Sequence, residues 1–353
     1  MGLKNLGGVK MKNILLEKGQ ELHEKLCEIS DYIYKNPELG NKEYKAVEVL
    51  TSFLKEHNFE IEKELLGIET AFRAIYDSKK EGPTIGYLCE YDALPLIGHG
   101  CGHNMIGSMS AGAGVILSKV IDKVGGRIIV YGTPAEETNG AKVILAEEGV
   151  FDELDVAMMV HPADITAKSG TSMALYPLQF TYKGKTAHAA SCPEKGINAL
   201  NSVIQLFNGI DALRQHVTPD VKMHGIITKG GVAANIVPDE AVADFYFRAS
   251  TKERVTEVIE KVKKIAEGAA LMTGATLEME RYELPYDDLK TNEKLSEMFN
   301  ENLRALGITD INPAKATGGS SDIGNVSHVA PTIHPYIGIT DCPMVGHSVE
   351  MAK

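Results

Sequence analysis

The order of strand and helix patterns is the feature of this sequence that most constrains its fold. Up to about residue 170, helical spacing of apolar residues alternates with short apolar runs, among them "PTIGYLCEYD", "RIIVYG" and "VAMMVHP". Short buried strands that alternate with helices are typical of an α/β fold. The sequence therefore predicts a mixed, largely parallel sheet flanked by helices, the first of which covers about residues 14–37.

A different order follows after residue 170. The segments "LQFTYKG", "KMHGIITKGG", "EAVADFYFRAS" and "ATLEMERY" read as strands, with one helix after the first strand and a second helix after the third. The second of these helices is expected to begin at a Thr251 cap and to end at Gly274. This β-α-β-β-α-β order is that of a ferredoxin-like α+β unit. We therefore expect a domain of residues 171–284 inserted into a larger one formed by 1–170 and 285–353, in which a helix near 291–306 and the strand "PTIHPYIGI" resume the first pattern.

Charge and cysteine content exclude several classes of protein. The net charge is −12 and Lys and Arg form no cluster, so we expect no nucleic-acid partner. No stretch is expected to span a membrane, and the N-terminal residues lack the apolar core of a signal peptide. Five scattered cysteines, an odd number, predict no disulfide framework. These features together predict a cytoplasmic protein.

The segment "GHGCGHN" is the first candidate for chemistry. Cys101 and His103 are two residues apart, so in extended backbone both side chains would point to one side. A thiolate and an imidazole are suitable ligands for zinc. A structural zinc finger would need a second ligand pair nearby, and a redox centre would need a paired cysteine, and neither is present.

Further candidates follow predicted strands. Glu136 and Glu137 come after "RIIVYG", His161 after "VAMMV", and His347 after the last strand. The carboxyl ends of the strands in an open α/β sheet meet at one edge, where ligands bind. Adjacent side chains diverge in extended backbone, so one glutamate could bind metal while the other acts as a base. Taken singly, each residue has an ordinary alternative, such as a buried cysteine, a solvated turn or a hydrogen-bonded histidine.

Nine motifs occur in an order that resembles a known family. They are "PELG", "EYDALP", "GHGCGHN", "GTPAEE", "MMVHP", "GKTAHAA", "AANIVPD", "FRAS" and "VGHS". The sequence resembles the aminoacylase and zinc carboxypeptidase family of metallo-amidohydrolases, in the branch of indole-acetyl-amino-acid hydrolases and p-aminobenzoyl-glutamate hydrolase. The resemblance implies a zinc-exopeptidase-like fold, in which the inserted domain is a dimerisation lid, and a homodimer.

The resemblance also implies residue roles. Cys101, His103, Glu137, His161 and His347 would bind two divalent ions, zinc or manganese, with cobalt as an alternative. Glu136 would be the general base for a metal-activated water, and His188 would stabilise the oxyanion in the partner subunit's site. Asn235 and Arg248 would bind the substrate, since a guanidinium group matches a carboxylate.

The implied reaction is hydrolysis of the amide bond in N-acyl amino acids, dipeptides or p-aminobenzoyl-glutamate-like compounds. The chain ends six residues after His347, where related sequences continue. Two alternatives therefore stay open: a truncated, non-catalytic relative that binds carboxylates, and a protein in which metal only stabilises the fold.

Overall fold

The computed structural model describes residues 2–314 and 318–352, and the chain divides into two compact units. Unit 1 comprises Met1–Thr171, Leu289–Thr317 and Ser321–Lys353, and unit 2 comprises Ser172–Asp288 and Gly318–Ser320. The domain division predicted from the sequence places the inserted domain at 171–284. The short segment Gly318–Ser320, which that division assigned to the larger domain, groups with unit 2.

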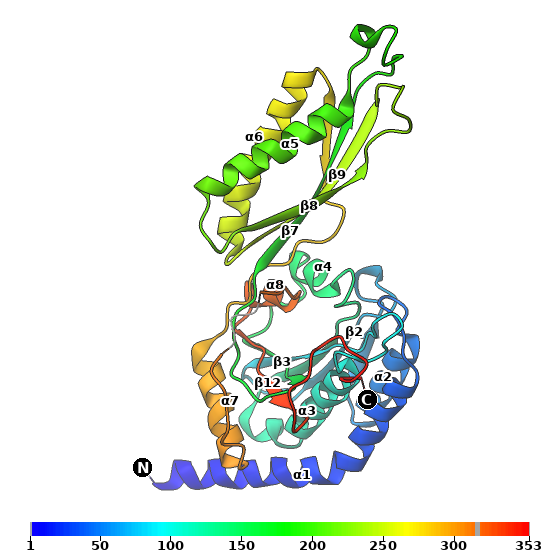
Figure 1. The fold of residues 1–353 in the computed structure, drawn as a ribbon. Helices are drawn as coiled ribbons and strands as arrows, with labels where there is room; N and C mark the ends of the chain where they lie inside the picture. Colours follow the sequence, from blue (N-terminus) through cyan, green and yellow to red (C-terminus); the bar gives the residue numbers. More distant parts are fainter. Residues whose placement is uncertain (1, 315–317, 353) are drawn as a thin grey trace. The chain divides into compact units, whose positions relative to one another are not determined.

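Unit 1 is built on a six-stranded sheet with helices on both of its faces (Figure 1). The strand order is β1-β2-β4-β3-β5-β11. Strand β3 pairs in parallel with β4 and β5, and β11 pairs in parallel with β5. Strand β2 pairs antiparallel with both β1 and β4. The strands are β1 (Glu60–Lys63), β2 (Phe72–Asp77), β3 (Thr84–Cys89), β4 (Arg127–Gly132), β5 (Val156–Met158) and β11 (Thr332–Ile333). The predicted mixed, largely parallel sheet is thus confirmed.

The helices of unit 1 follow from buried apolar faces. They are α1 (Gly2–Lys35), α2 (Tyr44–Glu56), α3 (His103–Val124), α4 (Ala141–Glu147), α7 (Glu293–Ala305) and α8 (Ile323–Ser327), with the short turn η1 (Leu65–Gly67). The first helix begins earlier than the predicted residue 14. In β4, Ile128 and Val130 pack into the core beneath α1, α2 and α3, while Ile129 and Tyr131 pack into the opposite core. A strand buried on both faces reads as a continuous apolar run.

Two predicted strands are each broken into two. "VAMMVHP" forms β5 and then β6 (His161–Ala163), and "PTIHPYIGI" forms β11 and then β12 (Tyr336–Gly338). β6 and β12 pair in parallel as a separate two-stranded sheet. The break matters for the site, because it places His161 at the start of a strand instead of at the end of one.

Helix α3 corrects one sequence expectation. By length and composition it could cross a membrane, although no stretch was expected to. It is mostly buried, and it packs against α1 and the sheet. An apolar composition on all sides is also what a core helix requires.

Unit 2 has the predicted ferredoxin-like order. Its antiparallel sheet runs β10-β7-β9-β8, formed by β7 (Ala174–Lys183), β8 (Lys222–Lys229), β9 (Glu240–Ala249) and β10 (Thr276–Glu280). Helices α5 (Ala199–Leu213) and α6 (Lys252–Thr273) cover one face, and η2 (Pro193–Lys195) and η3 (Arg214–His216) lie in the connections. The Thr251 side chain accepts a hydrogen bond from the N–H of Arg254, and Gly274 ends α6 in left-handed backbone. Both predicted ends of this helix are confirmed.

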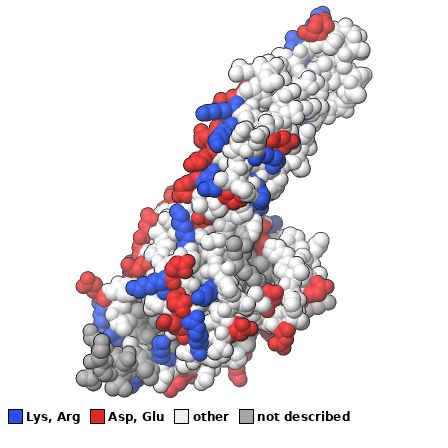
Figure 2. Space-filling view, turned by 60° about the vertical axis from the view of Figure 1, so that its left-hand side comes forward, with Lys and Arg blue, Asp and Glu red and all other residues white. Residues whose placement is uncertain are grey.

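The charges on the surface are mixed. On the face that Figure 2 shows, Lys and Arg side chains lie beside Asp and Glu side chains over both units. Ion pairs between exposed side chains include Lys183 with Glu278 and Arg304 with Glu297. Intermixed charges of this kind favour solubility and contribute little to stability individually.

Candidate metal centre

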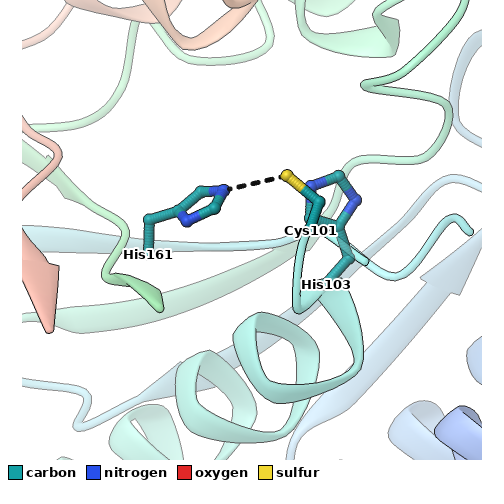
Figure 3. A group of neighbouring side chains, drawn as sticks. All are labelled: Cys101, His103 and His161. Atoms are coloured by element: carbon teal, nitrogen blue, oxygen red, sulfur yellow. Dashed lines mark hydrogen bonds between the residues drawn. The ribbon is translucent and has the colours of Figure 1, made fainter. Parts of the chain in front are cut away.

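The "GHGCGHN" segment is a tight turn that leads into α3, and this corrects the expectation of extended backbone. Cys101 lies in the turn, Gly102 has a left-handed φ of 76°, and His103 is the first residue of the helix. A Cβ at position 102 would lie 2.4 Å from the Cγ of Pro162. Only glycine combines this backbone with this close approach. Cys101 and His103 still point toward the same space (Figure 3).

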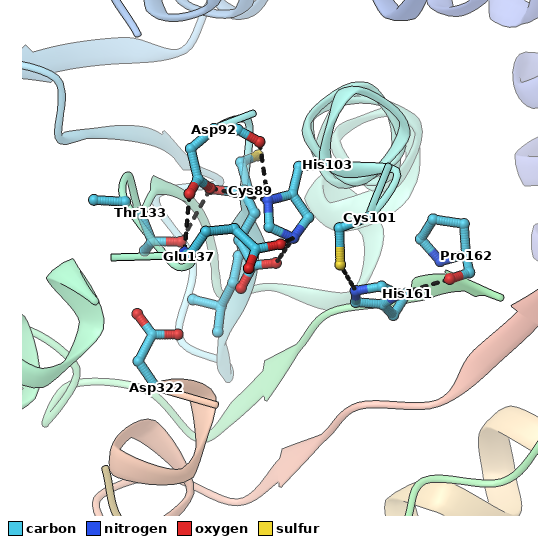
Figure 4. A network of polar contacts seen from close by, with 12 residues as sticks. Cys89, Asp92, Cys101, His103, Thr133, Glu137, His161, Pro162 and Asp322 are labelled. Atoms are coloured by element: carbon cyan, nitrogen blue, oxygen red, sulfur yellow. Dashed lines mark hydrogen bonds and ion pairs between the residues drawn. The ribbon is translucent and has the colours of Figure 1, made fainter. Parts of the chain in front are cut away.

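Hydrogen bonds fix the His103 ring in one tautomer. Its Nδ1 lies 2.9 Å from Oδ1 of Asp92 and 3.1 Å from the Asp92 carbonyl oxygen, so Nδ1 carries the proton. The other carboxylate oxygen of Asp92 accepts a hydrogen bond from the N–H of Glu137 (Figure 4). Asp92 thus orients His103 and the Glu137 turn together, as carboxylates behind metal-binding histidines do.

His161 is held in the same manner from the other side of the site. Its Nδ1 donates to the carbonyl oxygen of Pro162 at 2.7 Å, which leaves the Nε2 lone pair facing Sγ of Cys101 at 3.5 Å (Figure 3). Burial lowers the pKa of His161 to about 4, so the ring is neutral at physiological pH. A neutral imidazole is the form that binds metal.

Glu136 and Glu137 lie in a turn after β4 and not in extended backbone. Ala135, just before them, has a left-handed φ of 63°, and its N–H donates to the buried carboxyl group of Glu43 at 2.9 Å. The Ala135 carbonyl accepts from the N–H of Gly140. A strained non-glycine residue at this point is held by these two contacts, so Glu43 helps to set where the glutamates lie.

A backbone hydrogen bond positions the side chain of His347 at the site. Its N–H donates to the carbonyl oxygen of Gly100 at 3.1 Å, and its Nε2 lies 3.3 Å from Oε1 of Glu137. The side chain is about half exposed, so this is the open side of the site. All five residues predicted as ligands therefore come together in unit 1.

These residues fit divalent metal ions. Potential ligand atoms lie within 4.8 Å of one another in three overlapping groups: Cys101 with His103 and His161, Cys101 with Glu137 and His347, and His103 with Glu136 and Glu137. The buried Nε2 of His103 and Oε1 of Glu137 have no hydrogen-bond partner, and they lie 3.9 Å apart. Buried polar atoms without partners are costly, and a divalent ion between these two atoms would satisfy both of them.

Burial determines the pKa values of Cys101 and Glu136. Burial raises the pKa of its thiol to about 12, so this environment by itself would keep it protonated. A bound metal ion deprotonates a coordinating thiol outright. Burial, with Glu90 and Asp322 adding to it, also holds the pKa of Glu136 well above its usual value.

A buried ion cluster beside the site was missed by the sequence reasoning. The Lys142 ammonium lies 2.6 Å from Oε1 of Glu90 and 2.7 Å from Oδ1 of Asp322, and all three side chains are almost completely buried. The other oxygen of Glu90 lies 3.5 Å from Nε2 of His103. The available signal was a lone lysine in the apolar helix "AKVILAE", which only a buried partner can explain.

The remaining predicted residues lie in unit 2. His188 is exposed, and its Nδ1 accepts from the N–H groups of Ala190 and Ser191, so the neutral ring carries its proton on Nε2. The carbonyl oxygen of Asn235 accepts from the N–H of Ala189, which brings Asn235 beside His188. Arg248 lies at the other end of β9, where it donates to the hydroxyl of Ser320 at 2.7 Å.

Comparisons with known proteins place the chain among peptidases and amidohydrolases. The peptidase dimerisation domain family matches residues 177–272. The chain is 36% identical to the Xaa-Arg dipeptidase of Mus musculus, over 93% of this chain and 80% of that protein. It is 31% identical to one subunit of the p-aminobenzoyl-glutamate hydrolase of Escherichia coli, over 82% of this chain and 64% of that protein. A solved structure from Bacillus subtilis, described as a dinuclear metal-binding peptidase of the M20 family, has a TM-score of 0.74 at 19% identity and covers 94% of this chain and 92% of that one.

Fold, site and relatives together define a metallohydrolase of amide or peptide bonds. The chain belongs to the M20 family of metallopeptidases and amidohydrolases, in the branch that the sequence motifs indicated.

Proposed function

We propose that the protein is a dipeptidase or N-acyl amino acid amidohydrolase that holds two divalent ions, zinc or manganese. The single observation that carries this proposal is the convergence of Cys101, His103, Glu137, His161 and His347 on one space, with the inward atoms of His103 and Glu137 lacking hydrogen-bond partners. The dinuclear relative in the M20 family supports the number of ions.

Bound divalent ions would polarise the scissile carbonyl group and lower the pKa of an attacking water. Glu136 would take the proton from this water and hand it to the leaving amine, since its carboxyl group lies within 4.8 Å of the ligand atoms of His103 and Glu137. Asp92 and the Pro162 carbonyl would keep His103 and His161 in the tautomers that expose Nε2.

Unit 2 would supply the contacts between subunits. Its sheet ends at β8, which among the described residues pairs with β9 alone, and Ile226 and Ile227 on this edge are exposed. An unpaired edge strand with apolar side chains is suited to pair with a second copy of the same strand. In such a homodimer the Nε2–H of His188 would donate to the oxyanion in the partner's site.

The substrate would carry a free carboxylate. Arg248 is half-buried in β9, and burial lowers its pKa without removing its charge, so it is suited to a carboxylate. Asn235 lies beside His188, so in the homodimer it would hydrogen-bond the substrate together with His188, in the partner's site. The printed activities of the relatives favour a dipeptide, with p-aminobenzoyl-glutamate as the second candidate. We propose the cytoplasm as the location, because several cysteines outside disulfides are typical of a reducing compartment.

The test combines metal analysis with one substitution. Chain purified without chelator or nickel should hold about two zinc or manganese ions and hydrolyse members of a panel of dipeptides, N-acyl amino acids and p-aminobenzoyl-glutamate. Glu136→Gln should keep the ions and lower kcat by about 10²- to 10⁴-fold.

The matched control is Glu148→Gln, an exposed glutamate in the same part of the chain, which should leave kcat unchanged. Unchanged hydrolysis by Glu136→Gln at full metal loading would show that the proposed base is wrong. Substrate binding without turnover in the parent chain would favour the non-catalytic alternative.

A further inference from the structure

Three carboxyl groups crowd together on the inner side of the metal centre. Oxygen atoms of Glu90, Glu136 and Asp322 lie within 4.8 Å of one another, and Glu90 and Asp322 are almost completely buried. By geometry alone this cluster could hold a metal ion. Carboxylates this close in a buried site cannot all ionise unless a cation compensates them.

Lys142 supplies this cation. Its ammonium group contacts Glu90 at 2.6 Å and Asp322 at 2.7 Å, and its backbone N–H donates to the second oxygen of Asp322 at 3.3 Å. The Lys142 side chain is completely buried. The three residues come from the end of β3, the start of α4 and the start of α8, so the contacts also join three distant parts of unit 1.

Glu136 connects this cluster to the metal centre. Its carboxyl group lies in the group with Glu90 and Asp322 and also in the group with His103 and Glu137. Glu90 makes a second connection, since its other oxygen faces Nε2 of His103 at 3.5 Å. A cation in the inner cluster therefore influences which carboxylates face the metal ligands.

We propose that Lys142 is a built-in cation: its ammonium group occupies the place that a metal ion could take among Glu90, Glu136 and Asp322. Because it neutralises Glu90 and Asp322, these carboxylates do not bind a metal ion. Divalent ions are therefore confined to the ligand set of Cys101, His103, Glu137, His161 and His347. This positioning role rests on the proposed two-metal hydrolase function and adds a residue that no ligand motif contains. Glu90 and Asp322 then do not compete with the ligands for the ions.

The first experiment counts ions. Lys142→Ala removes the ammonium group and leaves space among the three carboxylates, so the variant dialysed against Mn²⁺ and then desalted should hold one more ion per chain than the parent. Adding Glu90→Gln and Asp322→Asn to it should abolish the extra ion. The control Lys119→Ala, which removes an exposed lysine of α3, should hold the parental number. A folded Lys142→Ala chain with the parental number of ions would overturn the proposal.

The second experiment does not depend on that variant folding. Breaking a buried ion pair is strongly destabilising, whereas replacing the whole group by neutral residues of similar volume often is not. The triple variant Lys142→Met, Glu90→Gln, Asp322→Asn should therefore fold and keep the parental number of ions. Its kcat should fall about 10- to 100-fold, as for other groups behind metal ligands, with KM changed less than about threefold. An additional ion in this variant would overturn the proposal, because Glu90 and Asp322 would no longer carry the charge that is proposed to hold it.

The two proposals fail in different ways. If the parent hydrolyses no substrate, the proposed function fails, whereas the number of ions in Lys142→Ala relative to the parent still decides the role of Lys142. If the parent hydrolyses substrate with two ions and Lys142→Ala gains none, only the role of Lys142 fails.

Discussion

The two units differ in whether their buried polar atoms have hydrogen-bond partners. In unit 2, the core between the sheet and helices α5 and α6 is apolar, and its buried polar groups are paired: Asp287 with the Lys252 ammonium, Asp288 with the Lys252 N–H, and Ser202 with Thr273. In unit 1, buried side-chain atoms without a hydrogen-bond partner include those of Glu43, Thr70, His103, Glu137 and His334. Among the described residues, every such atom lies in unit 1.

In unit 2 the buried polar groups named above find partners within the unit, whereas unit 1 leaves some of its buried polar atoms without a protein partner. A buried polar atom without a partner costs about 1–3 kcal/mol, so a fold keeps it only where something else satisfies it. The unpartnered atoms of His103 and Glu137 face the proposed ions, whereas the interior of unit 2 satisfies these polar groups without a bound ion.

Removal of the ions should have the largest effect, and it should be confined to unit 1. A ligand at a thousand times its Kd stabilises a protein by about 4 kcal/mol, so chelation of two ions should remove more than this. Hydrogen exchange followed by mass spectrometry should show lost protection in the "GHGCGHN" segment and the Glu136 turn, and parental protection in β7 to β10. Equal loss in both units would contradict the contrast, and added Zn²⁺ or Mn²⁺ should restore the parental pattern.

Phe245→Ala should destabilise unit 2 and leave the metal site of unit 1 unchanged. Phe245 is buried in unit 2. The centroid of its ring lies 4.7 Å from the ring centroid of Phe207 and 5.6 Å from that of Phe247. The cavity should cost about 3–5 kcal/mol of unfolding free energy, measured by denaturant titration. The number of bound ions should not change. Leu271→Ala, at an exposed position of α6, is the control and should cost less than about 0.5 kcal/mol.

Glu43→Gln should make the stability of unit 1 less dependent on pH. Burial raises the pKa of Glu43 from 4.5 to about 7, so ionisation of this group opposes folding. The parent should therefore lose stability relative to the variant as the pH rises from about 4.5 to 7, by about 3 kcal/mol in total. The side-chain amide oxygen of the variant would still accept the Ala135 N–H. Unfolding titrations at pH 5 and pH 8 measure the difference, and a pH-independent difference would contradict the assignment.

Thr251→Ala should have the smallest effect. The Thr251 hydroxyl caps α6 in unit 2, and loss of such a cap costs about 1 kcal/mol. Thr251→Ser keeps the acceptor and serves as the control. Thermal melting should resolve the two variants, and metal content and kcat should be parental in both. A change in kcat would mean that the fold of unit 2 affects the chemistry more directly than its paired interior suggests.

Sequence patterns predicted the elements of unit 2 closely because each of them carries its own signals. Period-2 alternation marks β9, a threonine cap begins α6 and a glycine ends it. In unit 1 the patterns predicted the type of sheet, but not the breaks between β5 and β6 or between β11 and β12. An apolar run in the sequence does not show whether its residues form one strand or are divided between strands of two sheets.

The sequence by itself determined the fold class, the inserted unit and the set of residues able to bind metal, because hydrophobic period and ligand chemistry are local properties. Only the tertiary structure decided how those residues meet. The turn at Gly102, the left-handed Ala135 held by Glu43 and the His347–Gly100 hydrogen bond all depend on contacts between distant segments. The pairing of Lys142 with Glu90 and Asp322 is the clearest case, since three charges separated along the chain become stable only when the fold buries them together.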